Sequence, residues 1–306
     1  MKFLKLIRYQ NLLMLAFMQL VFRYGFFKMQ NIQLALSDLQ YGLMVLSTVL
    51  IAAGGYVINN IYDQETDNYN KPQDVIVGKS ISETTAYNIY IVVTVIGVSI
   101  GFYLSNVIEK PGFSAIFILI AATLYLYATS LKQMMLIGNI VVALLLSFSI
   151  IIIGIFDLYP ATIASNQQEM RLYFSILLDY AIFAFIINLN REIVKDIEDI
   201  DGDCNQSMNT LAVAIGKSKT VKLVFILSFI PLITFIYYLN RYLLDLVFLS
   251  IYLLLFVCGP LLYFTIKIIS AKSKKDFHSL STVLKYMLFF GILSVVAITL
   301  NMKYNA

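Results

Sequence analysis

The chain has 306 residues, of which 60% are hydrophobic and only 13% are charged, and its formal net charge at pH 7 is +4. This composition excludes a protein that folds in water, because no polar region is long enough to form a separate domain. It gives no reason to expect a nucleic-acid partner. The sequence therefore predicts an integral membrane protein.

About nine stretches are long and apolar enough to cross a bilayer as helices, which takes roughly 20 residues each. They are residues 10–28, 41–60, 84–106, 113–131, 136–156, 172–190, 221–239, 243–266 and 282–301. The stretches are too long and too evenly apolar to be the alternating strands of a barrel. No linker or tandem repeat divides the chain. We therefore expect an all-α polytopic membrane protein, with about nine transmembrane helices in one bundle and a single domain over residues 1–306.

The first of two acidic segments follows the second apolar stretch and reads NNIYDQETDNYNKP, residues 59–72. If the second helix continues past the membrane surface, Asn59, Asp63 and Asp67 share one helical face at spacings of four. An oxygen-rich face suits Mg²⁺, which takes one or two carboxylates and completes its shell with water and phosphate oxygens. A solvated helix end with ordinary surface acids is the alternative.

The second acidic segment is expected to be a loop after the sixth helix, and it reads NREIVKDIEDIDGD, residues 190–203. Asp196, Asp199 and Asp203 recur at spacings of three and four, again one helical face. Arg191 and Lys195 lie about one turn from the same stripe. An ordinary charged loop between helices is the alternative here.

Two acid clusters on one membrane face indicate a specific chemistry. Clustered carboxylates repel one another near a medium of low dielectric constant, and divalent cations offset that cost. Mg²⁺ held by both clusters, with lysine or arginine nearby, would stabilise a diphosphate leaving an allylic carbon. A helical bundle would keep water from the carbocation, and Tyr and Phe rings would face it. We expect a prenyl diphosphate donor, a lipophilic acceptor and contact with membrane lipid.

A third polar stretch, YATSLKQMMLIGN at residues 127–139, joins the fourth and fifth predicted helices on the same face. Tyr127 and Lys132 could reach the diphosphate from there, although a positively charged turn that anchors the helices explains them equally well. Asp179, in the sixth predicted helix, is costly in lipid and should face the bundle interior or the outer interface. No role is assigned to it.

Positive charges indicate the orientation. Lysine and arginine prefer cytoplasmic loops, and they concentrate at the N-terminus and in every second connection between the predicted helices. This pattern predicts a cytoplasmic N-terminus, a C-terminus on the opposite side and cytoplasmic aspartate-rich loops.

These segments resemble the UbiA-type superfamily of intramembrane prenyltransferases. Its first motif, N-x-x-x-D-x-x-x-D, matches Asn59, Asp63 and Asp67. Its second motif, D-x-x-D-x-x-x-D preceded by lysine, matches Lys195, Asp196, Asp199 and Asp203. A further family pattern matches Tyr127, Lys132, Gly138 and Asn139. Nine helices agree with the family as well.

The second motif and residues 70–82 look most like the geranylgeranylglycerol-phosphate geranylgeranyltransferase-like branch of that superfamily. This resemblance implies a geranylgeranyl donor and a lipid-phosphate acceptor. Other branches use the same diphosphate machinery to prenylate aromatic quinone precursors, namely 4-hydroxybenzoate, 1,4-dihydroxy-2-naphthoate or homogentisate. Such an aromatic acceptor is the alternative.

The residues and the resemblance together predict a division of roles. Residues predicted to hold Mg²⁺ are Asp63 and Asp67 for one ion, and Asp199 and Asp203 for the other. Residues predicted to bind the diphosphate are Asn59, Lys71, Lys132, Arg191 and Asp196. The catalytic set comprises the four metal-binding aspartates, Lys195 and Tyr127, with Tyr127 near the leaving group or the cation.

A cation-dependent transporter is the alternative from another class. Transport predicts charged residues or broken helices at the bilayer midplane, whereas the acids of this chain cluster towards one surface. A phosphatidyl-alcohol transferase would need a D-G-x-x-A-R type of sequence, which the chain lacks.

Overall fold

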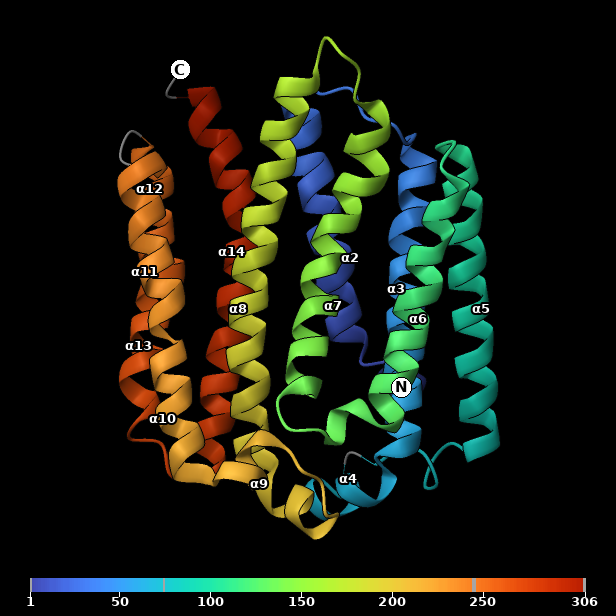
Figure 1. The fold of residues 1–306 in the computed structure, drawn as a ribbon, viewed down its shortest axis with the longest axis vertical. Helices are drawn as coiled ribbons and strands as arrows, with labels where there is room; N and C mark the ends of the chain where they lie inside the picture. The colour runs from blue at the N-terminus through green and yellow to red at the C-terminus, as the bar shows by residue number, and fades with distance from the viewer. Residues whose placement is uncertain (1, 74, 244–245, 305–306) are drawn as a thin grey trace.

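The computed structural model describes residues 2–73, 75–243 and 246–304. Over these ranges, nine helical segments are long and apolar enough to span a membrane, which confirms the expected all-α bundle (Figure 1). The segments are Tyr9–Gln30, Asp38–Tyr62, Glu83–Val107, Pro111–Thr129, Ile137–Ala161, Gln167–Asn205, Lys217–Arg241, Val247–Ile268 and Lys274–Tyr304.

Several spans are built from more than one element. The α-helices are α1 (Lys2–Leu6), α2 (Tyr9–Gly25), α3 (Asp38–Tyr62), α4 (Gln64–Asn70), α5 (Glu83–Val107), α6 (Ser114–Thr129), α7 (Ile137–Ile153), α8 (Gln167–Asn205), α9 (Leu211–Ile215), α10 (Lys217–Leu227), α11 (Phe229–Tyr238), α12 (Val247–Leu253), α13 (Gly259–Ile268) and α14 (Lys274–Tyr304). The 3-10 and π turns are η1 (Phe27–Gln30), η2 (Pro111–Phe113), η3 (Leu131–Gln133), η4 (Gly154–Leu158), η5 (Tyr159–Ala161), η6 (Leu239–Leu243) and η7 (Leu254–Cys258).

Local sequence explains where two of the spans begin. The Ser37 hydroxyl accepts a hydrogen bond from the amide of Gln40, and the Gln40 side chain accepts one from the amide of Ser37, so this pair starts α3. Ser82 caps α5 in a similar way by accepting from the amide of Thr85. Both caps satisfy amide groups that have no partner inside the helix.

The acidic segment predicted as a loop after the sixth span is instead the end of α8. This helix has 39 residues, which corresponds to a length of about 58 Å at 1.5 Å per residue. No residue between Asn190 and Asp201 breaks a helix, and Gly202 alone does not end it. The aspartates therefore stand on the same rigid element that crosses the membrane.

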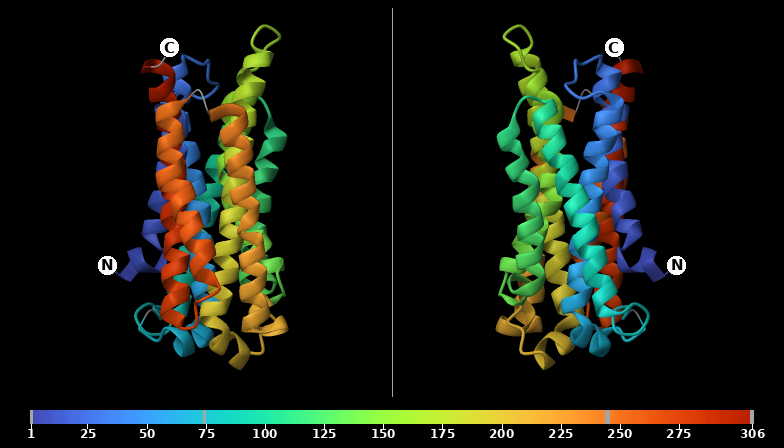
Figure 2. Two further views of the ribbon diagram at one scale, coloured as in Figure 1. Left: turned by 90° about the vertical axis from the view of Figure 1, so that its left-hand side faces the viewer. Right: turned by 90° about the vertical axis from the view of Figure 1, so that its right-hand side faces the viewer.

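The acidic segments lie at one end of the bundle. Figure 1 shows α4 and α9 at the lower end of the bundle and the C-terminus at the upper end. The side views in Figure 2 show α1 turning away from the bundle in the lower half of the molecule. Helix α8 packs against α7 and α14, and α3 packs against α5.

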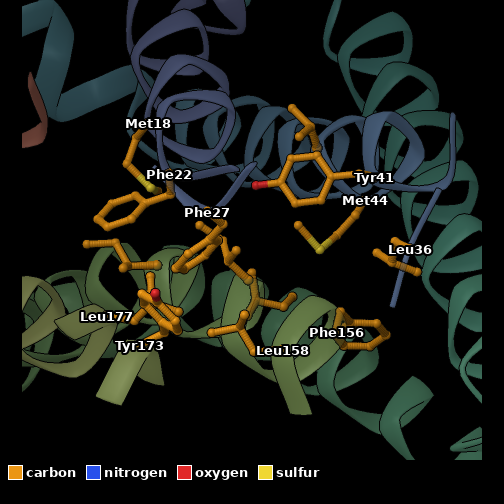
Figure 3. Close-up of a cluster of buried hydrophobic side chains, with 14 of the residues drawn as sticks. Met18, Phe22, Phe27, Leu36, Tyr41, Met44, Phe156, Leu158, Tyr173 and Leu177 are labelled. Atoms are coloured by element: carbon orange, nitrogen blue, oxygen red, sulfur yellow. The ribbon is translucent and has the colours of Figure 1, made fainter. Parts of the chain in front are cut away.

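The main hydrophobic core fills the upper half of the bundle. Side chains of α2, α3, η4 and α8 face one another there (Figure 3). Their labelled members include Phe22, Tyr41, Phe156 and Leu177, each fully buried or nearly so.

A buried ion pair lies within the upper half. The guanidinium of Arg23 pairs with Asp157, and it also lies over the ring of Tyr41, 4.4 Å from the centroid. The amide of Leu36 donates to the second carboxylate oxygen of Asp157 at 3.0 Å. Because both charges are buried, their pairing ties α2, α3 and η4 together at that end.

Candidate active site

The first acidic segment continues the path of α3 beyond Tyr62. The amides of Asp63 and Asp67 still bond to the carbonyl four residues earlier, at 2.9 and 2.8 Å. Asn59, Asp63 and Asp67 therefore follow one another along one helical face, as their spacing predicts. The Asn59 side chain donates to the Asp63 carboxylate at 2.5 Å.

The second acidic segment occupies the last turns of α8, which place Asp196, Asp199 and Asp203 on one face. The side-chain amide of Asn139, in α7, donates to the Asp196 carboxylate at 2.9 Å. The hydroxyl of Thr210, just before α9, donates to Asp203 at 3.1 Å. Neighbouring elements therefore hold the outer two aspartates in place.

Helix α4 packs directly on α8, and a glycine makes this approach possible. A Cβ atom at Gly202 would lie 2.1 Å from the side-chain nitrogen of Asn70, so a larger residue there would displace the Asn70 side chain. Asn70 donates to the backbone carbonyl of Asp199 at 3.3 Å. The two acidic segments, far apart in the sequence, thus face the same space.

The four predicted diphosphate-binding or catalytic cations all contact acids. Lys132 pairs with Asp63, and Lys71 lies 2.8 Å from Asp199. Lys195 and Arg191 both contact Glu192, at 2.9 and 3.0 Å. Acids and cations alternate in this space, and each ammonium or guanidinium could exchange its acid for a phosphate oxygen.

Two ionisable groups outside the membrane-spanning helices show how crowded these charges are. Burial, reinforced by the charge of Asp63, raises the pKa of Asp67 to about 6. Burial alone would lower the pKa of Lys71, but the charge of Asp199 and its hydrogen bond outweigh burial and raise it. Asp67 therefore loses its proton reluctantly, and Lys71 keeps its proton.

The acidic segments line a cavity of about 1190 Å³, here called the polar cavity. Every predicted site residue lines it; these are Asn59, Asp63, Asp67, Lys71, Tyr127, Lys132, Arg191, Lys195, Asp196, Asp199 and Asp203. The sequence-based prediction thus selected residues that the fold brings together from α3, α4, η3, α6 and α8.

A second cavity of about 180 Å³, here called the apolar cavity, extends from the polar cavity into the bundle. The two cavities share seven lining residues, which are Arg8, Asn11, Asn59, Tyr127, Arg191, Glu192 and Lys195. Counted along α3 and α6, the deepest lining residues are Thr48 and Phe117, about 15 Å beyond the shared residues Asn59 and Tyr127. A charged space therefore leads into a hydrocarbon-like one.

The polar cavity offers donors that fit Mg²⁺. The side-chain oxygen of Asn59 is buried and accepts no hydrogen bond, beside the carboxylates of Asp63 and Asp67. An all-oxygen set of this kind suits a hard divalent ion. Among the residues that the structure describes, no three acidic, histidine or cysteine side chains form a ready metal site, and lysines engage Asp63 and Asp199.

Sequence reasoning missed Glu192, which lines both cavities and holds Lys195 and Arg191. The position of Glu192 in the sequence could have revealed its role, because residues 192, 196, 199 and 203 share one helical face at spacings of four, three and four. It also missed Lys285, a single cation within the last apolar stretch. Arg8 was interpreted only as an orientation signal, although it lines both cavities.

Asp179 lies away from this site. The hydroxyl of Tyr238 donates to its carboxylate at 2.6 Å, so the pair links α8 to α11. Asp179 is half-buried and lines neither cavity. Its contact explains how an acid is accommodated in a spanning helix.

A membrane-embedded helical bundle, with charged groups at one end and an apolar cavity behind them, defines a class of proteins that act on amphiphiles with an anionic head. The match to a family model makes this class specific. Residues 16–300 match the UbiA prenyltransferase family, and the chain belongs to that family. The resemblance inferred from the two aspartate motifs is thereby confirmed.

Relatives with assigned names point in the same direction. The chain is 38% identical over 178 residues to digeranylgeranylglyceryl phosphate synthase of Sulfolobus acidocaldarius, an alignment that covers 58% of each chain. It is 30% identical to the enzyme of the same name from Methanosphaera stadtmanae, over 80% of this chain and 83% of the relative.

Solved structures share the fold. A structure of digeranylgeranylglyceryl phosphate synthase superposes with a TM-score of 0.65 over 96% of each chain, at 21% identity. A UbiA homologue from Archaeoglobus fulgidus, bound to GPP and Mg²⁺, superposes with a TM-score of 0.61 at 17% identity, over 96% of this chain and 99% of that one. The predicted nine-helix prenyltransferase fold is therefore confirmed.

Proposed function

We propose that residues 1–306 act as one domain that transfers a geranylgeranyl group from its diphosphate to geranylgeranylglyceryl phosphate or a related lipid, with Mg²⁺. The observation that carries this proposal is the junction of the two cavities. Asn59, Tyr127 and Lys195 line both of them. A diphosphate among the charged groups would place its prenyl chain in the apolar cavity.

The two acidic segments would hold the metal. Asp63 and Asp67 bind one Mg²⁺ and Asp199 and Asp203 the other, with Asn59 and Asp196 in support. When bound, Mg²⁺ would neutralise the diphosphate oxygens and make the diphosphate a better leaving group. The all-oxygen donor set and the structural neighbour bound to GPP and Mg²⁺ support this assignment.

The cations of the polar cavity assist the departure of the diphosphate. The bond between the allylic carbon and the diphosphate oxygen breaks, and its electron pair stays with the diphosphate. Lys71, Lys132, Lys195 and Arg191 balance that charge where it develops. The half-buried ring of Tyr127, at the junction of the cavities, faces the cation that remains.

The acceptor completes the reaction with a hydroxyl group. Its oxygen forms the new bond to the allylic carbon and passes its proton to the departed diphosphate, which gives an ether and protonated diphosphate. The names of the relatives support a glycerol phosphate lipid as the acceptor. The positive charges at the N-terminus and in alternate connections support a cytoplasmic position for the polar cavity.

Prenyl transfer by the purified protein in detergent tests the proposal. Labelled geranylgeranyl diphosphate and Mg²⁺ are offered with geranylgeranylglyceryl phosphate and, in parallel, with 4-hydroxybenzoate, 1,4-dihydroxy-2-naphthoate and homogentisate. We expect an ether product with the lipid alone, lost on chelation of the metal. Product with an aromatic acid and none with the lipid would overturn the acceptor assignment.

A further inference from the structure

The cations of the polar cavity fall into two groups. Lys71, Lys132, Arg191, Lys195 and Lys274 each lie within ion-pair distance of an acid. Lys5, Arg8, Lys275 and Lys285 also line the cavity, and none of the four makes an ion pair with an acid in the part of the chain that the structure describes. Of these four, Arg8 and Lys285 are positioned by contacts with a tyrosine ring and an asparagine side chain. A cation without an acid at a cavity wall is free to bind an anion brought by a ligand.

Lys285 is held in a defined position. It lies on α14, inside an apolar stretch, and is half-buried. Its ammonium group donates to the side-chain oxygen of Asn11 on α2, at 3.1 Å. A lysine that only anchored its helix at the membrane surface would not need to reach across to α2.

Arg8 lies one turn before Asn11 and is also fixed. Its backbone has φ +48°, a left-handed conformation that is uncommon for a residue other than glycine. This conformation turns the chain from α1 into α2. The guanidinium lies over the ring of Tyr56, 5.4 Å from the centroid. Arg8, Asn11 and Lys285 thus line one wall of the cavity.

The charge balance of the polar cavity leaves room for a second anion. Nine lysine and arginine residues line the cavity, against seven aspartate and glutamate residues, which leaves an excess of two positive charges before any metal binds. Bound Mg²⁺ ions would neutralise the donor diphosphate. Arg8 and Lys285 are therefore not required for the diphosphate, and their charge suits a phosphate monoester.

The surroundings favour a phosphate that carries hydrocarbon. Phe17 of α2 and Phe289 of α14 stack at a centroid distance of 5.5 Å. Phe289 lies about one turn beyond Lys285, and Phe17 lies nearly two turns beyond Asn11. Leu13 and Tyr286 are exposed beside them, on surfaces that face lipid. An amphiphile could place its phosphate against Lys285 while its chain extends over this apolar surface.

We propose that Arg8, Asn11 and Lys285 bind the phosphate group of the lipid acceptor beside the diphosphate site, since Arg8 and Asn11 also line the junction of the two cavities. This inference rests on the proposed function, because it requires a phosphorylated acceptor. It assigns specificity for the acceptor to the start of α2 and to α14, which carry none of the aspartates proposed to bind Mg²⁺. Glu192 pairs with Arg191 and Lys195. These two cations therefore remain in the group that the proposed function assigns to the donor diphosphate.

The test compares two acceptors, geranylgeranylglyceryl phosphate and geranylgeranylglycerol, in steady-state kinetics. Lys285→Met keeps the apolar stem and removes the charge, and Arg8→Gly removes the charge at a φ that glycine adopts readily. For both variants we expect the KM of the phosphorylated acceptor to rise about 10–100-fold, as for loss of one charge-assisted hydrogen bond. The KM of the donor should not change.

Two further readouts separate binding from a structural role. The preference for the phosphorylated over the unphosphorylated acceptor should fall in both variants, whereas Lys285→Arg should restore it. Lys222→Met is the matched control, since Lys222 is exposed in the middle of α10 and lines neither cavity.

An unchanged preference in the variants, or an equal rise in the KM of the donor, would overturn the inference. Failure of the proposed function looks different, because the wild-type protein would then transfer to neither lipid. If Lys285→Met lowers the thermal stability, Lys285→Gln takes its place. Its preference for the phosphorylated over the unphosphorylated acceptor is measured in the same way and should also fall.

Discussion

The ammonium group of Lys71 lies 2.8 Å from a carboxylate oxygen of Asp199, although 128 positions separate the two residues in the chain. This ion pair joins the end of α4 to the last turns of α8. Lys71 also lies 3.8 Å from Glu198. The acids of α8 therefore hold a charged lysine at the place where a diphosphate would bind.

We expect Lys71→Met to weaken binding of the donor. Loss of a charge-assisted hydrogen bond costs about 1.5–3 kcal/mol, which corresponds to a rise of about 10–100-fold in the KM of the donor. Steady-state kinetics with varied donor concentration measure this KM. Lys79→Met is the control, because Lys79 is exposed and bonds to Asn68 and to the carbonyl of Pro72. The same rise in both variants would contradict the role of Lys71.

Asp63→Ala should abolish transfer and also lower stability. The substitution removes a proposed metal ligand and leaves Lys132, whose side chain is 8% exposed, without its acid. An unpaired charge of this kind should lower the free energy of unfolding by about 1–3 kcal/mol. Asp63→Ala with Lys132→Ala should recover stability but not activity. Thermal unfolding and transfer assays on the same samples separate the effects, and transfer by Asp63→Ala would refute the metal assignment.

Binding of Mg²⁺ should weaken below about pH 6. The pKa of Asp67 is raised to about 6 by burial and by Asp63, so in the metal-free protein Asp67 contributes most to stability at low pH and this contribution is lost as pH rises through 6. Metal binding requires the deprotonated form, so protons compete with it below that pH. Thermal shifts caused by Mg²⁺ across this range measure the effect. In Asp67→Asn, the thermal shift caused by Mg²⁺ should depend less on pH.

The depth of the apolar cavity should set the preferred length of the donor. Phe117 lines its deep end, and the Phe117 ring rests on Gly101, where a Cβ would lie 2.3 Å from the ring. Gly101→Ala should push the ring into the cavity and favour shorter donors, whereas Phe117→Ala should favour longer ones. Competition between farnesyl and geranylgeranyl diphosphate measures the ratio of products.

Gly42→Ala is the control for this pair, because nothing lies within 4 Å of a Cβ at Gly42 in α3. Its product ratio should equal that of the wild-type protein. A ratio that Gly101→Ala and Phe117→Ala shift in the same direction would show that Phe117 does not limit the cavity.

The spans and the aspartate faces could be predicted from the sequence because each depends on a local pattern. Long apolar runs specify helices in lipid, and spacings of three and four place Asp196, Asp199 and Asp203 on one face. The predicted loop after the sixth span was wrong, since charged residues end an apolar run without ending a helix. Only a helix-breaking residue or an alternative partner for the backbone does that.

The remaining site residues depend on contacts that no local pattern encodes. Lys285 meets Asn11 across 274 positions, and nothing near either residue indicates the other. Arg23 is likewise buried against Asp157, 134 positions away. An isolated charge within an apolar stretch was the available signal in both cases. The roles of the metal-binding and diphosphate-binding residues are still predictions.

The length of α8 makes the bilayer part of the site. About 58 Å of continuous helix exceeds the hydrocarbon core of roughly 30 Å, and its last turns carry Asp196, Asp199 and Asp203. The apolar residues 172–190 of α8 cover only about 28 Å, so its charged last turns project beyond that core. A thinner or thicker bilayer changes the tilt of the bundle and with it the depth of both acid sets at the membrane surface, so we expect transfer rates in vesicles to vary with acyl-chain length.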